Sequence, residues 1–396
     1  MSRPVIPYGR HSIDEDDVAA VVDVLRHGWL TQGPKVAEFE RAIADYVGAR
    51  HAVAVSSGTA ALHIAAAAAG LAAGDTAITS PNTFVASANC VQYVGATAQF
   101  ADIDPATLNL DPAALERRCR ELGRVKSVIP VHFGGLPCDM AAIRRIADAA
   151  GARVIEDASH ALGATYASGR RVGCGDHADM TVFSFHPVKL MATAEGGMVT
   201  TNDEALHRDL LRLRSHGINK QDDAFAFPEL ASTDGEENFW YYEMQELGFN
   251  YRLTDLQCAL GLSQFAKLPK FLERRRTLAL RYDRLLAGIP HITPAQPRNR
   301  ERNAHHLYLV RIDFKTLGKS RNAFMRALRE RSILCQVHYI PAHMHPYYRR
   351  NGHAGDRFPA TEAWYEQALS LPLYYSLTDE EQDYVVAKVK EQLGCA

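Results

Sequence analysis

Short apolar runs that alternate with helix-length stretches constrain the fold of this chain more than any other feature of its sequence. The runs lie at Ala52–Val55, Thr76–Thr79, Ala98–Ala101, Ser127–Val131, Arg153–Glu156, Thr181–Ser184 and Met198–Thr201. Stretches such as Ala60–Gly70 and Met140–Ala150 have the length of helices and separate several of these runs. Apolar strands joined by helices are typical of a mostly parallel sheet covered on both faces. The sequence therefore predicts a large α/β domain with three layers, α/β/α.

The two ends of the chain predict further elements. Ser12 and Glu15 form a capping-box pattern that predicts the start of a helix. Pro34 begins a second predicted helix, which has three apolar residues on one face, Phe39, Ile43 and Val47. After Leu256 a long helical pattern runs through Arg281. It is followed by two predicted strands and a closing helix, at Leu307–Ile312, Ile333–His338 and Glu380–Leu393.

The change of pattern near residue 265 predicts two domains. A chain of 396 residues is too long for one small core. We place a large domain at residues 1–265 and a smaller C-terminal α/β domain at residues 266–396. We expect the N-terminal segment to pack on the smaller domain.

Composition argues against several classes of protein. The 44 Lys and Arg residues against 46 Asp and Glu leave a net charge of −2, so no basic excess favours nucleic acid or anionic lipid. The apolar stretch Ala60–Ala73 is too short to span a membrane, and Met1–Arg10 has no apolar segment typical of a signal peptide. Seven scattered cysteines without a CxxC pair predict reduced thiols in a cytoplasmic protein.

Candidate site residues follow the predicted strands, because ligands of open α/β sheets bind beyond the carboxyl ends of the strands. Ser57-Gly58-Thr59-Ala60 follows the first strand at a helix start and offers backbone N–H groups to a phosphate. An ordinary Ser or Thr N-cap explains this motif equally well. Asp157 follows the strand Arg153–Glu156, where a buried acid needs a partner such as a protonated pyridine nitrogen. A helix-capping aspartate is the alternative interpretation.

Lys189 lies shortly after the strand Thr181–Ser184. A lone lysine is most often a surface residue. A lysine near a cation-binding site at a strand end can instead lose its proton and act as an amine nucleophile.

The phosphate loop, Asp157 and Lys189 occur together in the order found in fold-type-I enzymes that use pyridoxal 5'-phosphate (PLP). Over nearly its whole length the chain resembles the sugar-nucleotide aminotransferase family of the DegT/DnrJ type. The segments that carry the resemblance are Gly28–Gly33, Ser56–Leu62, Glu156–Ala158, Ser184–Lys189, Glu195–Gly197 and Gly248–Gln257.

Four local segments resemble the branch of this family that serves pseudaminic acid biosynthesis. They are Ser159–Gly163, Thr193–Gly197, Arg214–Gly217 and Gln336–Tyr339. Many family members carry Gln where His160 stands and Gly where Ala194 stands. The resemblance implies amination at C4 of a UDP-4-keto-6-deoxy-N-acetylhexosamine by L-glutamate, giving UDP-4-amino-4,6-dideoxy-N-acetyl-β-L-altrosamine.

The resemblance also implies a role for each site residue. Lys189 carries PLP and relays protons, and Asp157 keeps the pyridine nitrogen protonated. The phosphate is bound by groups from three places: the turn after the first predicted strand, the end of the strand Thr181–Ser184, and the neighbouring subunit. The residues are Ser57, Gly58, Thr59, Ala60, Ser184 and Asn250. Phe84 stacks on the ring, and His160 bonds the phenolic oxygen or lies under the ring. The expected substrate contacts are Tyr8, His216, Arg252, His338 and Tyr339.

The role of Asn250 implies a homodimer with a shared active site. Arg252 is expected to bind a carboxylate or a substrate phosphate, and an exposed arginine at a helix start is the alternative. His338, His343 and His345 match no zinc spacing, so we expect a sugar pocket and no metal there.

Three other functions compete with this one. The first is an aminotransferase for the D-sugar epimer, as used for legionaminic acid or bacillosamine. The second is a PLP-dependent sugar dehydratase, whose branch replaces the lysine with histidine. The third is a non-catalytic regulator, which would not need Lys189, Asp157 and Asn250 together.

Overall fold

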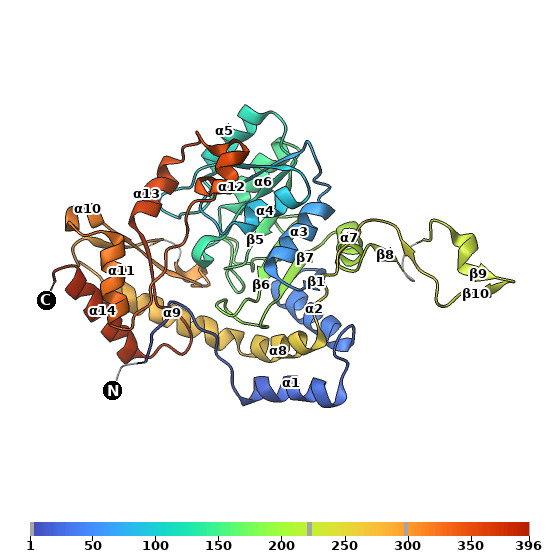
Figure 1. Ribbon diagram of the computed structural model, residues 1–396, viewed down its shortest axis with the longest axis horizontal. Helices are drawn as coiled ribbons and strands as arrows, with labels where there is room; N and C mark the ends of the chain where they lie inside the picture. Colours follow the sequence, from blue (N-terminus) through green and yellow to red (C-terminus); the bar gives the residue numbers. More distant parts are fainter. Residues whose placement is uncertain (1–3, 220–223, 297–299, 396) are drawn as a thin grey trace.

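The computed structural model of the protein describes residues 4–219, 224–296 and 300–395. Figure 1 shows an α/β body and a long arm that projects from it between α7 (Glu204–Arg214) and α8 (Asp255–Ala266).

A seven-stranded sheet forms the centre of the body. Its strands are β1 (His51–Val55), β2 (Thr76–Thr79), β3 (Thr97–Phe100), β4 (Ser127–Ile129), β5 (Arg153–Asp157), β6 (Met180–Ser184) and β7 (Gly197–Thr201). They lie in the order β1-β7-β6-β5-β4-β2-β3. Only β7 is antiparallel to its neighbours, so the other strands all point the same way. All the strands predicted for this region are present, with ends shifted by one or two residues.

Helices cover both faces of this sheet because successive strand side chains point to opposite sides. Ala54, Val154 and Phe183 pack into one core with α2 (Pro34–Val47), α5 (Pro112–Leu122), α6 (Met140–Ala149) and α8. Val53, Ile155 and Val182 pack into a second core with α3 (Gly58–Ala68), α4 (Ala86–Tyr93) and α7. The predicted α/β/α layering is confirmed.

The first helix does not begin where the sequence pattern placed it. α1 (Glu15–His27) is capped by Asp14, whose side chain accepts from Asp17 N while the Asp17 carboxylate accepts from Asp14 N. The predicted Ser12 and Glu15 cap is therefore wrong. A tertiary contact explains the shift, because the buried Asp17 carboxylate also accepts from Ser263 Oγ and Gln264 Nε2 of α8.

The long helical pattern after Leu256 is two helices. α8 ends at Ala266, and α9 (Leu268–Leu285) starts two residues later with a proline in its first turn. Pro269 has no N–H to donate and cannot continue the hydrogen-bond ladder of α8.

A smaller, antiparallel sheet lies in the C-terminal part of the chain. Its strands are β12 (Ile292–Pro294), β13 (Tyr308–Ile312) and β14 (Ala368–Leu371). Five further helices follow β13: α10 (Phe314–Leu317), α11 (Arg321–Glu330), α12 (Pro346–Tyr348), α13 (Pro359–Gln367) and α14 (Asp379–Gln392). A third apolar core joins this sheet to α9, α11 and α14.

The predicted strand Ile333–His338 is wrong. Ile333 forms an isolated parallel bridge with Ile6, and Gln336 forms an isolated antiparallel bridge with Ser370. Because the two ends of the segment pair with different partners, no continuous ladder forms. The N-terminal segment thus lies against the C-terminal part of the chain, and the domain boundary near residue 265 stays a prediction.

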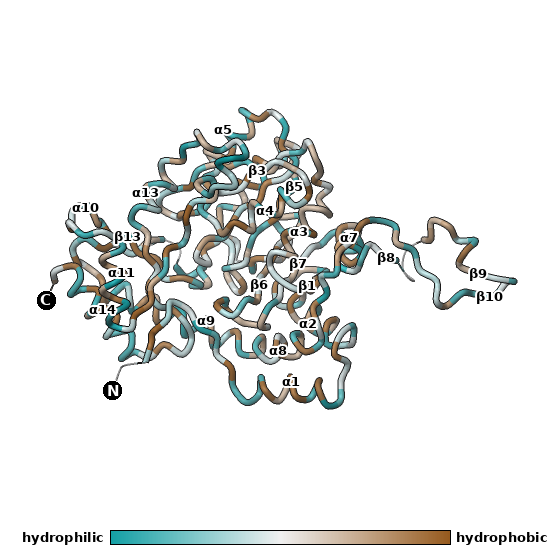
Figure 2. The backbone as a smooth tube through the Cα atoms, viewed as in Figure 1, coloured by the Kyte–Doolittle hydropathy of each residue, from teal (hydrophilic) through white to brown (hydrophobic). Residues whose placement is uncertain are grey.

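Over its described residues, the projecting arm carries four short strands and several exposed apolar side chains. Its strands are β8 (Ile218–Asn219), β9 (Ser232–Thr233), β10 (Glu236–Glu237) and β11 (Glu243–Met244). Phe239 is 85% exposed and Leu247 is 81% exposed. Figure 2 shows apolar and hydrophilic segments alternating along the arm. Contiguous exposed apolar side chains mark surfaces that other molecules cover.

Among the described residues, no helix combines the length and the apolar character needed to cross a membrane.

A substitution at Gly197, the first residue of β7, tests the packing at the carboxyl end of the sheet. A Cβ on Gly197 would lie 2.4 Å from Ser57 O and 2.8 Å from Gly58 N, which are backbone atoms with little freedom to move. We expect Gly197→Ala to destabilise the protein by about 1–3 kcal/mol, as measured by denaturant unfolding. Gly355→Ala is the matched control, because a Cβ there meets open space. Equal stability of the two variants would contradict the close contact.

Candidate active site

A cavity of about 550 Å³ lies at the edge of the sheet where the parallel strands end. Most of the residues predicted for the site line it: Tyr8, Ser57, Gly58, Thr59, Phe84, Asp157, His160, Ser184, Lys189, His338 and Tyr339. Four predicted residues do not line it: Ala60, His216, Asn250 and Arg252.

The turn from β1 into α3 forms one wall. Ser57 is the N-cap of α3, and its Oγ accepts from Ala60 N at 3.1 Å, so Ala60 lies behind the first turn. The backbone N–H groups of Gly58 and Thr59 have no acceptor among the described residues. A Cβ on Gly58 would lie 2.8 Å from Ser184 Cβ, so only glycine lets the Ser184 hydroxyl approach this turn. Free N–H groups and a hydroxyl at a helix N-terminus suit a phosphate.

Asp157 ends β5 and is buried, with 5% of its surface exposed. Its Oδ2 accepts from Ser87 Oγ at 2.6 Å, and its Oδ1 accepts from Ser159 N at 3.1 Å. These bonds orient the carboxylate without neutralising its charge. The charge is thus available to a cationic ring nitrogen in the cavity.

Lys189 follows β6 through a turn in which Lys189 N donates to His186 O at 2.8 Å. The loop around it is closed because Phe185 N donates to Gly196 O and Thr193 N donates to Phe185 O. Burial lowers the pKa of the Lys189 amine to about 8, and the nearby carboxylate of Asp157 acts in the opposite direction. At pH 7 about a tenth of the amine is therefore neutral, and this form can accept a proton or attack a carbonyl.

His160 is held between two defined partners. Gly134 N donates to His160 Nδ1 at 3.3 Å, so the ring proton lies on Nε2, which is 3.2 Å from Tyr339 Oη. The ring of His306 lies 4.3 Å from that of His160, centre to centre. Burial holds the pKa of His160 well below its usual value, and the charge of Lys189 adds to this effect. His160 is therefore a neutral donor to Tyr339.

His338 is another buried residue of the cavity lining. Its Nδ1 is 2.7 Å from Ser370 Oγ, and its carbonyl accepts from Trp364 Nε1 at 3.1 Å. Burial lowers its pKa to about 3, with Lys189 as the second cause. The Tyr8 ring lies 5.3 Å from the His338 ring. Phe84 lies at the mouth with 56% of its surface exposed, 6.0 Å from the Tyr339 ring.

The segment that carries Asn250 and Arg252 lies beside the end of β1, outside the cavity. Ser56 N donates to Tyr251 O at 2.8 Å, and Arg252 forms an isolated bridge with Val55. Asn250 and His216 are exposed, and the backbone of His216 bonds to Phe249 O. No arginine among the described residues lines the cavity.

Several residues of the site were missed from the sequence, and Ser87 and His306 have the clearest partners. Ser87, which bonds Asp157, lies one helical turn after Thr83, and the two hydroxyls are 2.7 Å apart. The contact with Asp157 joins residues that are 70 positions apart in the chain, so no local pattern indicates it. His306 lies two residues before β13, and no sequence pattern links it to His160.

Asp157 and Lys189 lie in one cavity beside a phosphate-binding turn. A comparison with known protein families agrees with this arrangement. A model of the DegT/DnrJ/EryC1/StrS aminotransferase family matches residues 11–390. The chain belongs to this family. The family depends on PLP, so the chain is a PLP-dependent sugar aminotransferase with the fold of type-I PLP enzymes.

The chain is similar to named proteins over nearly its whole length. The spore coat polysaccharide biosynthesis protein SpsC of Bacillus subtilis is 42% identical over 98% of this chain and 96% of its own length. Helicobacter pylori PseC, an aminotransferase involved in the biosynthesis of pseudaminic acid, is 32% identical with a TM-score of 0.89, covering 98% of this chain and 99% of PseC. The PLP form of the sugar aminotransferase Spr1654 of Streptococcus pneumoniae is 30% identical with a TM-score of 0.85, covering 98% and 99%.

The lowered pKa of Lys189 predicts its reactivity. In cofactor-free protein we expect acetylation of Lys189 by acetic anhydride, followed by peptide mass spectrometry, to reach half its maximal rate near pH 8. Exposed lysines reach this point about two pH units higher. Asp157→Asn removes the charge that raises the pKa, so its midpoint should fall below that of the wild type. A Lys189 midpoint equal to that of exposed lysines would contradict the burial argument.

Proposed function

We propose that this enzyme transfers the amino group of L-glutamate to C4 of a UDP-4-keto-6-deoxy-N-acetylhexosamine. The product is UDP-4-amino-4,6-dideoxy-N-acetyl-β-L-altrosamine, an intermediate of pseudaminic acid biosynthesis. The observation that carries the proposal is the likeness to PseC over nearly the full length of both chains. His160 and Ala194, the two positions that resemble the pseudaminic branch, support it, and His160 lines the cavity.

The residues of the cavity suit PLP. When bound, PLP supplies an electron-accepting ring that lets an amino acid lose its Cα proton. The N–H groups of Gly58 and Thr59 and the Ser184 hydroxyl would hold the phosphate. Asp157 would hold a proton on the ring nitrogen, and Phe84 would cover the ring at the mouth.

Lys189 is the residue that we assign to proton movement. Its amine lines the cavity near Asp157 and is partly neutral at neutral pH. In that form it would carry the cofactor. It would also take the proton from Cα of glutamate and return it at C4′ of the cofactor. The same amine would act in reverse on the sugar.

The sugar would contact the wall opposite Lys189. Because His160 donates to Tyr339 Oη, the hydroxyl proton of Tyr339 is left to donate to a substrate oxygen. His338 is neutral and would offer its Nε2 in the same region. Tyr8 lines the cavity beside it.

We infer that the working enzyme is a homodimer with a shared active site. L-Glutamate and a UDP-sugar are both anionic, yet the cavity of one chain has no arginine in its described lining. Asn250 and Arg252 lie on the outer side of the phosphate-binding turn, next to the apolar arm. In a dimer, Asn250 of a second copy would reach the phosphate, and Arg252 or His216 would bind the anionic substrates.

We also propose that the enzyme works in the cytoplasm. All seven cysteines are free thiols. Reduced thiols are typical of that compartment.

Choice of sugar is tested by comparing two 4-keto substrates that differ at C5. With L-glutamate as donor, we expect kcat/KM for the L-altro precursor to exceed that for UDP-2-acetamido-2,6-dideoxy-4-keto-glucose by at least about tenfold. Product formation is followed by anion-exchange chromatography. Lys189→Ala should aminate neither sugar. Equal kcat/KM values for the two sugars would contradict the assignment to the pseudaminic branch. A wild type that aminates neither sugar would contradict the proposed reaction.

Sharing of the site is tested with hybrid dimers. Lys189→Ala and Asn250→Ala are each expected to be inactive. After the two are unfolded and refolded together, about half of the dimers are hybrids with one intact site in two, so roughly a quarter of wild-type activity returns.

A mixture of Lys189→Ala and Asp157→Asn is the matched control, because both residues line the cavity of the same chain. That mixture should stay inactive. Recovery in the control, or none with Asn250→Ala, would contradict a site shared in this way.

A further inference from the structure

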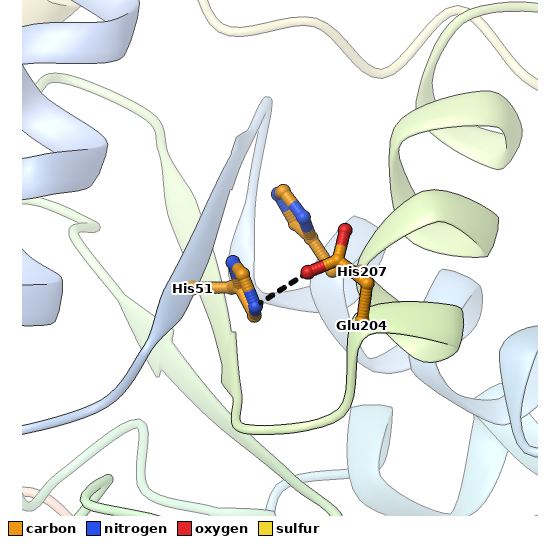
Figure 3. A group of neighbouring side chains, drawn as sticks. All are labelled: His51, Glu204 and His207. Carbon is orange, nitrogen blue, oxygen red and sulfur yellow. Dashed lines mark ion pairs between the residues drawn. The ribbon is translucent and has the colours of Figure 1, made fainter. Parts of the chain in front are cut away.

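Three potential metal ligands meet at the amino end of β1, away from the active site. His51 is the first residue of β1, and Glu204 and His207 lie three residues apart on one face of α7. One ligand atom from each lies within 4.8 Å of the others. Figure 3 shows the three side chains between the strand and the helix.

The two imidazoles have a defined arrangement. His51 Nε2 lies 3.1 Å from Glu204 Oε2. The rings of His51 and His207 are stacked, with centres 4.3 Å apart and planes inclined by 11°. The His51 side chain is 21% exposed and that of Glu204 is 65% exposed, so an ion from solvent can reach the group.

The backbone that presents these ligands is held in place by Asn202, in the turn from β7 to α7. Asn202 Oδ1 accepts from Arg50 N at 2.8 Å, and its Nδ2 donates to Cys174 O at 2.8 Å. Asp203 caps α7 by accepting from Ala205 N and Leu206 N. Strand pairing of His51 with Thr201 completes the frame. The backbone positions of the ligands are therefore fixed before any ion binds, and the stacked rings must rotate about their side-chain torsions to direct both nitrogens at one ion.

Two imidazoles and one carboxylate form a donor set that suits zinc and similar transition metals better than calcium or magnesium, which prefer oxygen. The positive end of the α7 dipole opposes a cation, and the Glu204 carboxylate offsets it.

We propose that His51, Glu204 and His207 bind one Zn²⁺ ion per chain, with water in the remaining position. The ion ties the start of β1 to the start of α7. β1 is five residues long, so the site lies roughly 16 Å from the phosphate-binding turn at 3.3 Å per residue. The metal therefore has a structural role and takes no part in amino transfer.

The test uses tag-free, PLP-loaded protein treated with a chelator and titrated with ZnCl₂ by calorimetry. We expect one equivalent per chain with the wild type. His51→Ala and His207→Ala should each weaken this binding by at least about tenfold. Glu204→Gln should also weaken it, because it removes the charge and keeps the size of the side chain. Zn²⁺ should raise the Tm of the wild type and leave that of His207→Ala unchanged.

His27→Ala is the matched control. His27 also lies beside a carboxylate on a helix, with Nδ1 3.0 Å from Asp23 Oδ1, but it has no second imidazole. It should bind Zn²⁺ like the wild type. CoCl₂ gives a second readout, because visible bands of tetrahedral Co²⁺ should appear in the wild type and be absent in His207→Ala.

Unchanged PLP absorption in each variant shows that the fold is retained. Equal Zn²⁺ affinity of the wild type and both histidine variants would overturn the proposal. Absence of the cobalt bands in the wild type would overturn it as well. Neither result would affect the proposed amino transfer, which has its own assay.

Discussion

The active site depends on parallel strands that all end at one edge of the central sheet. β1, β5 and β6 supply the phosphate-binding turn, Asp157 and Lys189 to that edge, and the reversed β7 lies between β1 and β6 in the sheet. The close contact of Gly197 with Ser57, and of Gly58 with Ser184, brings these strand ends within reach of one ligand. Glycine is required at both positions because a single Cβ would push the walls apart.

Burial at this edge decides the charge state of the site. It lowers the pKa of Lys189 to about 8 and keeps His160 and His338 neutral, while Asp157 remains an acceptor held by Ser87 and Ser159. The buried Asp157 carboxylate thus faces an amine with a lowered pKa and two neutral imidazoles. Such a cavity favours a cationic ring next to Asp157 and leaves Lys189 free to exchange protons.

The proposed dimer would account for two surfaces of a single chain. The arm exposes Phe239 and Leu247, and Asn250 lies beside the phosphate-binding turn but outside the cavity. A dimer would cover the apolar arm and bring basic groups to a cavity whose described lining contains no arginine. At the other end of β1, the proposed zinc ligands would fix the same strand from its start.

The sequence by itself determined the layers, the strands of the central sheet and the chemistry at the strand ends, because apolar periodicity and residue type are local properties. It also indicated Asp157 and Lys189, since both follow buried strands. Only the tertiary structure decided what lies across the cavity: Ser87 on Asp157, His306 on His160, and Tyr339 within hydrogen-bond distance of His160. The cap of α1 and the segment 333–338 were mispredicted for the same reason. Their partners lie far away in the chain, and contacts between distant segments leave no local pattern.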